Sequence, residues 1–290
     1  MKCARRAATQ RNYSSGARKY IKFCGFLDAN PFVPISEENL AMCAILFCHD
    51  CSVHTLASWL SAVENFCRLE KLPKLPKGTD YYEVVAGLKN IYGQVDIQKP
   101  ATAFDWSDLV LLHAGIDFGC LADVQFWCAT ILGFQGLFRA SEIGRVQLDH
   151  IEINAWGVRV TVLFSKTNPS PVPVTMVARG DAFCPVLGFL LLKKLLRAAG
   201  EVSPFPSSYA TFNRSLQMRC SDAGIAKQGI STHSLRRGGT TALALAGVPE
   251  AFIQAHGRWS SLEYRKYICY LDSALQRRPT AMLLESQRAA

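Results

Sequence analysis

Residues 232–270 read THSLRRGGTTALALAGVPEAFIQAHGRWSSLEYRKYICY and concentrate phosphate-binding chemistry in one stretch of the chain. Thr232 precedes an apolar periodic run, as helix N-caps do, so we expect a helix that places His233 and Arg236 on one face near its N-terminus. That end of a helix attracts an anion. A Gly-Val-Pro break and a second apolar run lead to Trp259 and then to tyrosines at helical spacing. An electropositive pocket that faces tyrosines predicts attack on a phosphodiester.

The order of these motifs is more specific than any one of them. A short HxxR motif recurs by chance, and a cluster of His, Arg, Trp and Tyr can be an ordinary surface. The whole stretch, however, resembles the C-terminal signature of the tyrosine recombinases (the phage-integrase family), in which HxxR precedes a glycine turn with His or Trp and then the nucleophilic tyrosine. The phrase HGRWSSLEYRKYI is especially similar to the recombinases of eukaryotic Crypton and DIRS-type mobile elements.

Upstream, residues 136–145 read GLFRASEIGR and resemble the family's first arginine motif. The resemblance implies that Arg139 is a catalytic arginine and that Glu142 is the acidic residue that holds its cationic partners in place. A guanidinium fits two phosphate oxygens at once, and a carboxylate behind it limits its rotamers. The alternative is an ordinary i, i+3 surface ion pair on a helix.

Alternating apolar residues from Val158 to Phe164 and from Val172 to Val177 predict a β-hairpin with Lys166 at its turn. In the family that the chain resembles, a lysine on this hairpin reaches into the site and protonates the leaving oxygen. An exposed turn lysine is the alternative, because most lysines lie on the surface.

The resemblance implies cleavage of double-stranded DNA through a 3′-phosphotyrosyl linkage, without metal, nucleotide or other cofactor. Two arginines clamp the non-bridging oxygens, a histidine takes the proton of the attacking tyrosine, and a lysine protonates the departing 5′ oxygen. A tryptophan that can donate its indole N–H stands where many relatives have histidine. The site residues that the resemblance implies are Arg139, Glu142, Lys166, His233, Arg236, Trp259 and Tyr267.

Three tyrosines could in principle be the nucleophile. Tyr264 follows Trp259 closely, and Tyr270 lies in an apolar segment that is typical of packing. Tyr267 has the spacing from Trp259 of the Crypton and DIRS-like pattern, which is one residue shorter than in many bacterial relatives. We therefore expect Tyr267 to attack and the other two to be amphipathic core residues.

The composition suits a polyanionic partner. The 290 residues include 32 Lys and Arg against 23 Asp and Glu, a net charge of +9, and the pI is about 9.0. Nucleic acid is favoured over an anionic membrane surface, and no apolar run is long enough to span a bilayer. The 11 scattered cysteines fit a reducing compartment. We expect an intracellular, soluble protein that is nuclear if the host is eukaryotic and cytoplasmic otherwise.

The expected fold is mainly α with a small antiparallel β-sheet, an α+β arrangement in two domains. Residues 1–99 read as a helical core-binding (SAM-like) DNA-binding domain, and residues 100–290 as the recombinase catalytic domain. Pro100 disfavours helix for the residue before it and marks the linker. The expected helices span residues 14–27, 36–48, 52–69, 81–92, 106–115, 122–136, 187–199 and 209–223.

Cysteines and histidines between residues 43 and 54 offer an alternative metal site. Cys48 and Cys51 form a CxxC, but no second ligand pair follows at zinc-finger spacing. Cys43 lies within an apolar helical run, so we expect a core helix that ends in a loop.

Resemblance further implies four protomers that exchange strands between two duplexes through a Holliday junction. Few residues follow Tyr267, so an exchange of C-terminal segments between protomers is expected to be reduced. Two alternatives stay open. One is a domesticated DNA-binding protein that keeps the fold without catalysis, and the other is a type IB topoisomerase that uses the same chemistry on one duplex.

Overall fold

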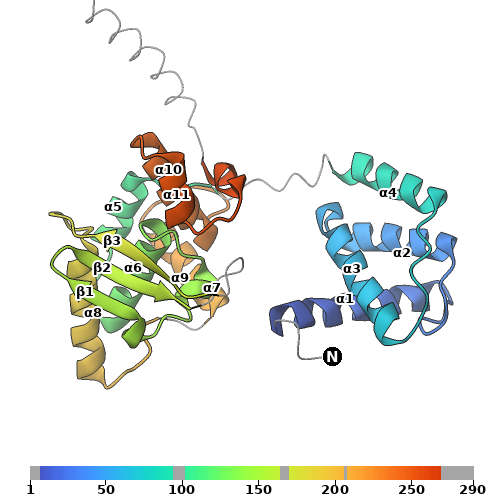
Figure 1. The fold of residues 1–290 in the computed structure, drawn as a ribbon, viewed down its shortest axis with the longest axis horizontal. Coiled ribbons are helices and arrows are strands. Elements are labelled where there is room, and N and C mark those ends of the chain that lie inside the picture. Colours follow the sequence, from blue (N-terminus) through green and yellow to red (C-terminus); the bar gives the residue numbers. More distant parts are fainter. Residues whose placement is uncertain (1–6, 94–101, 164–169, 206–207, 269–290) are drawn as a thin grey trace, which may run out of the picture. The chain divides into compact units, whose positions relative to one another are not determined.

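The computed structural model describes residues 7–93, 102–163, 170–205 and 208–268, and the chain forms two compact units, residues 1–99 and 100–290. The described residues are mainly helical with a small antiparallel sheet, which confirms the predicted fold class (Figure 1). Among them, no helix is both long and apolar enough to cross a membrane. Lys166 and Tyr270 lie outside the described residues.

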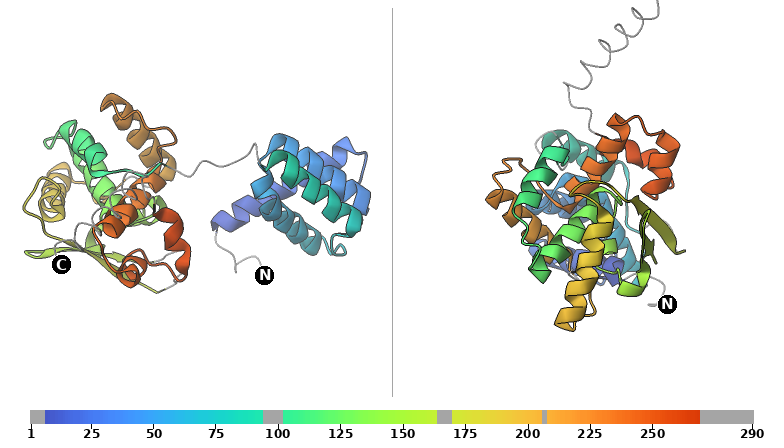
Figure 2. Two further views of the ribbon diagram at one scale, coloured as in Figure 1. Left: turned by 90° about the horizontal axis from the view of Figure 1, so that it is seen from above. Right: turned by 90° about the vertical axis from the view of Figure 1, so that its left-hand side faces the viewer.

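The described part of the first unit is helical (Figures 1 and 2). Its elements are α1 (Ala7–Phe26), α2 (Glu37–Asp50), the 3₁₀ helix η2 (Val53–Thr55), α3 (Leu56–Leu69) and α4 (Thr79–Tyr92). α1 begins at Ala7, before the predicted start at Ser14, because no Gly or Pro interrupts the preceding residues. The N-cap of α2 is Ser36, whose Oγ accepts a hydrogen bond from Asn39 N at 3.2 Å, as the sequence predicts.

A close helix crossing builds the core of the first unit. At Gly16 in α1, an added Cβ would lie 2.4 Å from Ala62 Cβ in α3, so the two helices meet where neither has a bulky side chain. Trp59 Nε1 donates to Gly16 O at 3.1 Å across this contact. The thiols of Cys43 and Cys48 are buried in the same core, on the inner face of α2.

The second unit is built around one buried helix. Its α-helices are α5 (Trp106–Ala114), α6 (Leu121–Phe134), α7 (Ala140–Ile143), α8 (Pro185–Ala199), α9 (Tyr209–Asp222), α10 (Thr232–Leu245) and α11 (Glu250–His256). Every residue from Phe126 to Phe134 in α6 is buried. α6 contacts both α8 and α10, and α8 in turn covers the sheet (Figure 1). Because α6 is apolar on all sides, it packs against neighbours on all sides.

The sheet has one strand more than the predicted hairpin. In the described residues, β1 (Ile151–Asn154), β2 (Gly157–Val162) and β3 (Val172–Val177) pair antiparallel in the order β1-β2-β3. Asn154 Oδ1 accepts from Gly157 N at 3.1 Å and closes the tight turn between β1 and β2. The 3₁₀ helix η3 (Leu148–His150) leads from α7 into β1.

Helix α10 lies unusually close to the backbone of its neighbours. A Cβ at Gly238 would lie 2.1 Å from Phe104 O, and one at Gly239 would lie 1.8 Å from Phe134 O at the end of α6. The Gly-Gly pair therefore lets α10 pack directly on the chain that precedes the first arginine. The N-cap of α10 is Ser231, not Thr232 as predicted, because Ser231 N donates to Ser234 Oγ at 3.0 Å.

Candidate active site

Arg139 lies in the loop between α6 and α7, just before the first residue of α7. Its backbone N donates to Glu142 Oε2 at 2.9 Å, and its Nη1 donates to Glu142 Oε1 at 2.8 Å. The predicted i, i+3 pair is therefore present, although Arg139 precedes the helix. The Glu142 side chain is only 3% exposed and that of Arg139 is 16% exposed. The carboxylate thus stands behind the arginine, which reaches toward solvent.

Arg236 lies in the first turns of α10 and is fully buried. Its Nη1 donates to Leu137 O, and its Nη2 donates to Gly257 O at 2.7 Å. These bonds join α10 to the Arg139 loop and to the turn that follows α11. Its Nε has no hydrogen-bond partner among the described residues. A buried guanidinium with an unused donor favours an additional acceptor.

Arg258 is a site residue that the motif analysis did not single out. It is 7% exposed, and its Nη2 donates to Glu142 Oε2 at 2.9 Å. Gly257 and Trp259, the residues on either side of it, belong to the glycine-turn motif. This position was the only signal in the sequence that could have identified Arg258. Glu142 is therefore shared by two arginines.

Trp259 lies face-on to the Arg236 guanidinium, with 4.1 Å between the Arg236 Cζ and the ring centroid. Tyr264 and Tyr267 follow in η4 (Leu262–Tyr267), which is a 3₁₀ helix and not the expected α-helix. Residues three apart eclipse in a 3₁₀ helix, so both rings face Trp259, with centroid separations of 6.2 Å and 5.2 Å. The Tyr267 ring also lies 5.5 Å from Arg236 Cζ.

His233 lies on the first turn of α10 and reaches solvent. Surrounding side chains desolvate its imidazole, and this desolvation, with the charges of Arg236 and Arg139, lowers its pKa below 6.5. The neutral ring therefore predominates at neutral pH and is able to accept a proton. The backbone N–H of Thr232 donates to Asn213 Oδ1 at 3.0 Å, so this N–H at the helix end already has an acceptor.

The site carries excess positive charge. Arg139 and Arg258 both bond the carboxylate of Glu142, and Arg236 shares the carbonyl of Leu137 with Arg258. Burial by itself raises the pKa of Glu142, but the charges of Arg258 and Arg139 outweigh it, so the pKa lies below 4.5. Burial and the charges of Arg139 and Arg258 lower the pKa of Arg236 to about 9, which still leaves it charged at pH 7. Such a cluster is stabilised by an incoming anion.

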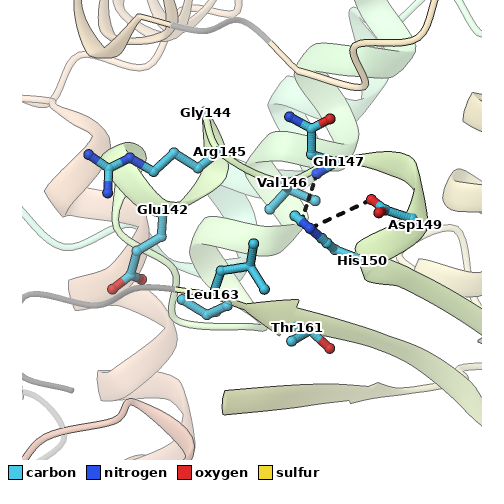
Figure 3. Close-up of a pocket in the computed structure, with 10 residues that line it drawn as sticks. Glu142, Gly144, Arg145, Val146, Gln147, Asp149, His150, Thr161 and Leu163 are labelled. Carbon is cyan, nitrogen blue, oxygen red and sulfur yellow. Dashed lines mark hydrogen bonds and ion pairs between the residues drawn. The ribbon is translucent and has the colours of Figure 1, made fainter. Parts of the chain in front are cut away.

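A cavity of about 600 Å³ opens beside this cluster, between α7, η3 and β2 (Figure 3). Glu142 and Leu163 both line it. Leu163 is the last described residue before the segment that carries Lys166. At the far side of the cavity His150 Nδ1 accepts from Gln147 N at 3.0 Å (Figure 3).

The structure thus brings Arg139, Glu142, Arg236, Trp259 and Tyr267 into one connected group, with His233 at its edge. Within the described ranges, no group of three or more His, Cys, Asp or Glu side chains could hold a metal ion. The arrangement can bind an anion through guanidinium groups and present a phenol to it.

No protein-family model and no curated protein matches this sequence. Solved structures do match it in fold. XerH site-specific recombinase, bound to a palindromic difH substrate in a post-cleavage complex, aligns with a TM-score of 0.60 and 16% identity over 86% of this chain and 72% of that chain. The Tn1549 transposon integrase in complex with transposon right end DNA gives a TM-score of 0.60 and 12% identity over 97% and 96% of the two chains.

A lambda integrase tetramer bound to a Holliday junction is also similar, with a TM-score of 0.59 and 14% identity over 92% of this chain and 73% of that chain. At these identities the likeness concerns the fold. The fold of this chain is that of the tyrosine recombinases and integrases.

Proposed function

We propose that this protein is a DNA recombinase that cuts and rejoins strands through a covalent phosphotyrosine intermediate. The observation that carries the proposal is the buried arginine cluster with Tyr267 packed against it, since these groups match what phosphodiester cleavage requires. The fold is that of site-specific recombinases and integrases, which supports the same reading.

The chemistry is a transfer of the phosphoryl group from DNA to protein. Tyr267 Oη attacks phosphorus, the P–O5′ bond breaks, and a 3′-phosphotyrosyl bond forms. Neutral His233 takes the phenol proton, Lys166 gives a proton to the 5′ oxygen, and Arg139 and Arg236 stabilise the charge on the non-bridging oxygens. The intermediate keeps the energy of the phosphodiester, so a 5′-hydroxyl from a second strand can reverse the step.

Substrate binding has to rearrange the site. Arg236 is fully buried, with the rings of Trp259 and Tyr267 over its guanidinium. A phosphate therefore reaches Arg236 only after a covering ring moves, and movement of the Tyr267 ring also frees the phenol to turn toward phosphorus. Movement of the nucleophile and opening of the anion pocket become one event in this scheme.

The remaining inferences extend the proposal to the whole protein. We infer that the first unit is the core-binding domain and that four protomers act on two duplexes, as the Holliday junction complex of lambda integrase suggests. The HGRWSSLEYRKYI phrase points to an element of the Crypton or DIRS type.

Covalent capture from a pool of DNA tests the proposal. Duplexes with a nick inside a randomised segment lose the short 5′-hydroxyl fragment after cleavage, so the intermediate accumulates. We expect a denaturation-resistant adduct at a 3′ phosphate that forms in EDTA, because side chains supply all the charges. Binding without any adduct would point to a non-catalytic DNA-binding protein, and cleavage that requires magnesium would exclude the mechanism. Relaxation of plasmid without strand exchange would indicate a topoisomerase.

A further inference from the structure

Arg258 has an environment that differs from that of an arginine which merely fills the core. Its backbone adopts φ +61°, a left-handed conformation that is rare for residues other than glycine. It lies directly before Trp259, and its guanidinium turns back to the Arg139 loop. Its Nη1 donates to Gly136 O at 3.3 Å and to His256 O at 3.1 Å. A backbone held in such a conformation commonly marks a functional constraint.

Two acceptors join all three arginines of the site. Glu142 Oε2 accepts from Arg258 at 2.9 Å and from the backbone N of Arg139 at 2.9 Å. Leu137 O accepts from Arg258 at 3.0 Å and also from Arg236. Leu137 itself has φ +52°, so the segment before Arg139 is strained as well. Arg258 thus contacts the backbone before Arg139 and the carboxylate after it.

We propose that Arg258 is the positioning residue of this site: it holds the loop from Gly136 to Glu142 so that Arg139 meets the scissile phosphate in the correct orientation. The proposal rests on the proposed phosphodiester cleavage and adds a residue to it. Glu142 Oε1 accepts from the Arg139 guanidinium, and Glu142 Oε2 accepts from Arg258 and from the Arg139 backbone N. A planar fork is required, because Arg258 must reach a carboxylate and three carbonyls at once.

Electrostatics argues against a purely structural role. Arg258 is paired with Glu142 but lies beside two other arginines, and replacement of a buried ion pair by apolar residues of similar volume is often neutral or stabilising. The arrangement becomes favourable when a phosphate anion completes it. Arg258 therefore belongs with the anion site, because it shares Glu142 with Arg139 and Leu137 O with Arg236.

The test is a double-mutant cycle on a duplex captured from the random pool, with single-turnover adduct formation as the readout. Arg258→Lys keeps the charge but loses the fork, so we expect a rate on the order of 10–100-fold lower. Arg139→Ala should be slower still, and Arg139→Ala/Arg258→Lys should be no slower than Arg139→Ala alone, because Arg258 acts through Arg139. A substrate with a neutral methylphosphonate at the scissile position lacks the charge that the arginines bind. On this substrate the rate loss caused by Arg139→Ala and the rate loss caused by Arg258→Lys should both be smaller.

Arg219→Lys is the matched control. Arg219 pairs with Asp123 at 2.5 Å and stacks on Phe126, as Arg258 pairs with Glu142 and stacks on Phe138, but it lies away from the site. It should lower the melting temperature and leave the cleavage rate unchanged. If Arg258→Lys does not fold, Glu142→Gln takes its place, with the same non-additivity expected.

Two outcomes separate the proposal from its premise. If the wild-type protein forms no adduct with any duplex, the proposed function fails and Arg258 has no reaction to serve. The wild type could instead form the adduct while the rate losses of Arg139→Ala and Arg258→Lys multiply in the double variant, or while the Arg258→Lys loss persists in full on the methylphosphonate. In either case Arg258 is only a structural residue.

Discussion

At the scale of single residues, Tyr264 and Tyr267 differ in what surrounds them. Tyr264 is 1% exposed, and its hydroxyl donates to Glu250, which also pairs with Arg265 at 2.8 Å. The Tyr267 ring instead lies over Trp259 and Arg236. Tyr264 is therefore held away from the anion site by a carboxylate, and Tyr267 is next to it.

We predict that Tyr267→Phe abolishes the covalent adduct and leaves DNA affinity within about twofold, because only the nucleophilic oxygen is removed. Tyr264→Phe and Tyr270→Phe should still form the adduct. Gel analysis of denatured complexes measures this directly. An adduct that persists in Tyr267→Phe, and that mass spectrometry maps to another residue, would overturn the assignment.

Lys166 has a role that substrate chemistry can isolate. If it protonates the leaving 5′ oxygen, a 5′-phosphorothiolate, whose sulfur leaves without a proton, should restore cleavage by Lys166→Ala to near the wild-type rate. Arg139→Ala should gain little, because its charge acts on the non-bridging oxygens. Equal rescue of both variants would refute this division of roles.

The pH dependence of cleavage follows from His233. Since its pKa lies below 6.5, the imidazole is neutral at pH 7 and becomes protonated only as the pH falls below that value. Adduct formation at subsaturating DNA should stay constant from pH 8 to 6.5 and decline below it. Glu142 titrates lower, below 4.5.

The control for that profile is His256, whose pKa is also lowered, mainly by burial, and whose ring bonds to Gln135 O at 2.8 Å. In His256→Gln, adduct formation should still decline below pH 6.5. In His233→Asn, it should no longer decline there. A decline in adduct formation centred above pH 6.5, or a decline that persists in His233→Asn, would argue against His233 as the proton acceptor.

At the scale of elements, the contact between α10 and α6 sets the geometry of the site. We predict that Gly239→Ala destabilises the protein by about 1–3 kcal/mol, because the new Cβ would overlap Phe134 O and push the segment that leads to Leu137. Cleavage should fall too, since Leu137 O binds two of the arginines. Urea denaturation measures the change in unfolding free energy.

Gly188→Ala in α8 is the control for this substitution. Its Cβ would lie 3.4 Å from Cys128 Sγ, an ordinary contact, so alanine should stabilise the helix by up to about 1 kcal/mol. If Gly239→Ala is equally harmless, close approach of α10 to α6 does not position the loop.

At the scale of the whole molecule, the net charge of +9 should dominate DNA affinity. Binding releases counterions, so we predict that log K falls linearly with log salt, with a slope of about −0.9 for each phosphate neutralised. Arg139→Gln should reduce the slope by about one, and Tyr267→Phe should not change it. Fluorescence anisotropy across a salt series provides the measurement, and a flat profile would contradict DNA as the partner.

Much of this protein follows from its sequence alone. Apolar periodicity and caps such as Ser36 predicted the helices, since both signals act within a few residues of the chain. Alternation predicted β2 and β3, and the paired motifs placed Arg139 with Glu142 and Arg236 with Trp259. The missed strand β1 is only four residues long, which is too short for a clear period.

Tertiary structure alone decided how these pieces meet. Arg258 pairs with Glu142 from 116 residues away, and no local pattern encodes a contact at that separation. The 3₁₀ form of η4 and the burial of Arg236 beneath Trp259 and Tyr267 are likewise features of the folded protein that the sequence motifs did not predict. A sequence specifies which side chains carry charge, but whether a charge is buried, shared or covered is set by packing between distant elements, because desolvation is a property of the folded surroundings.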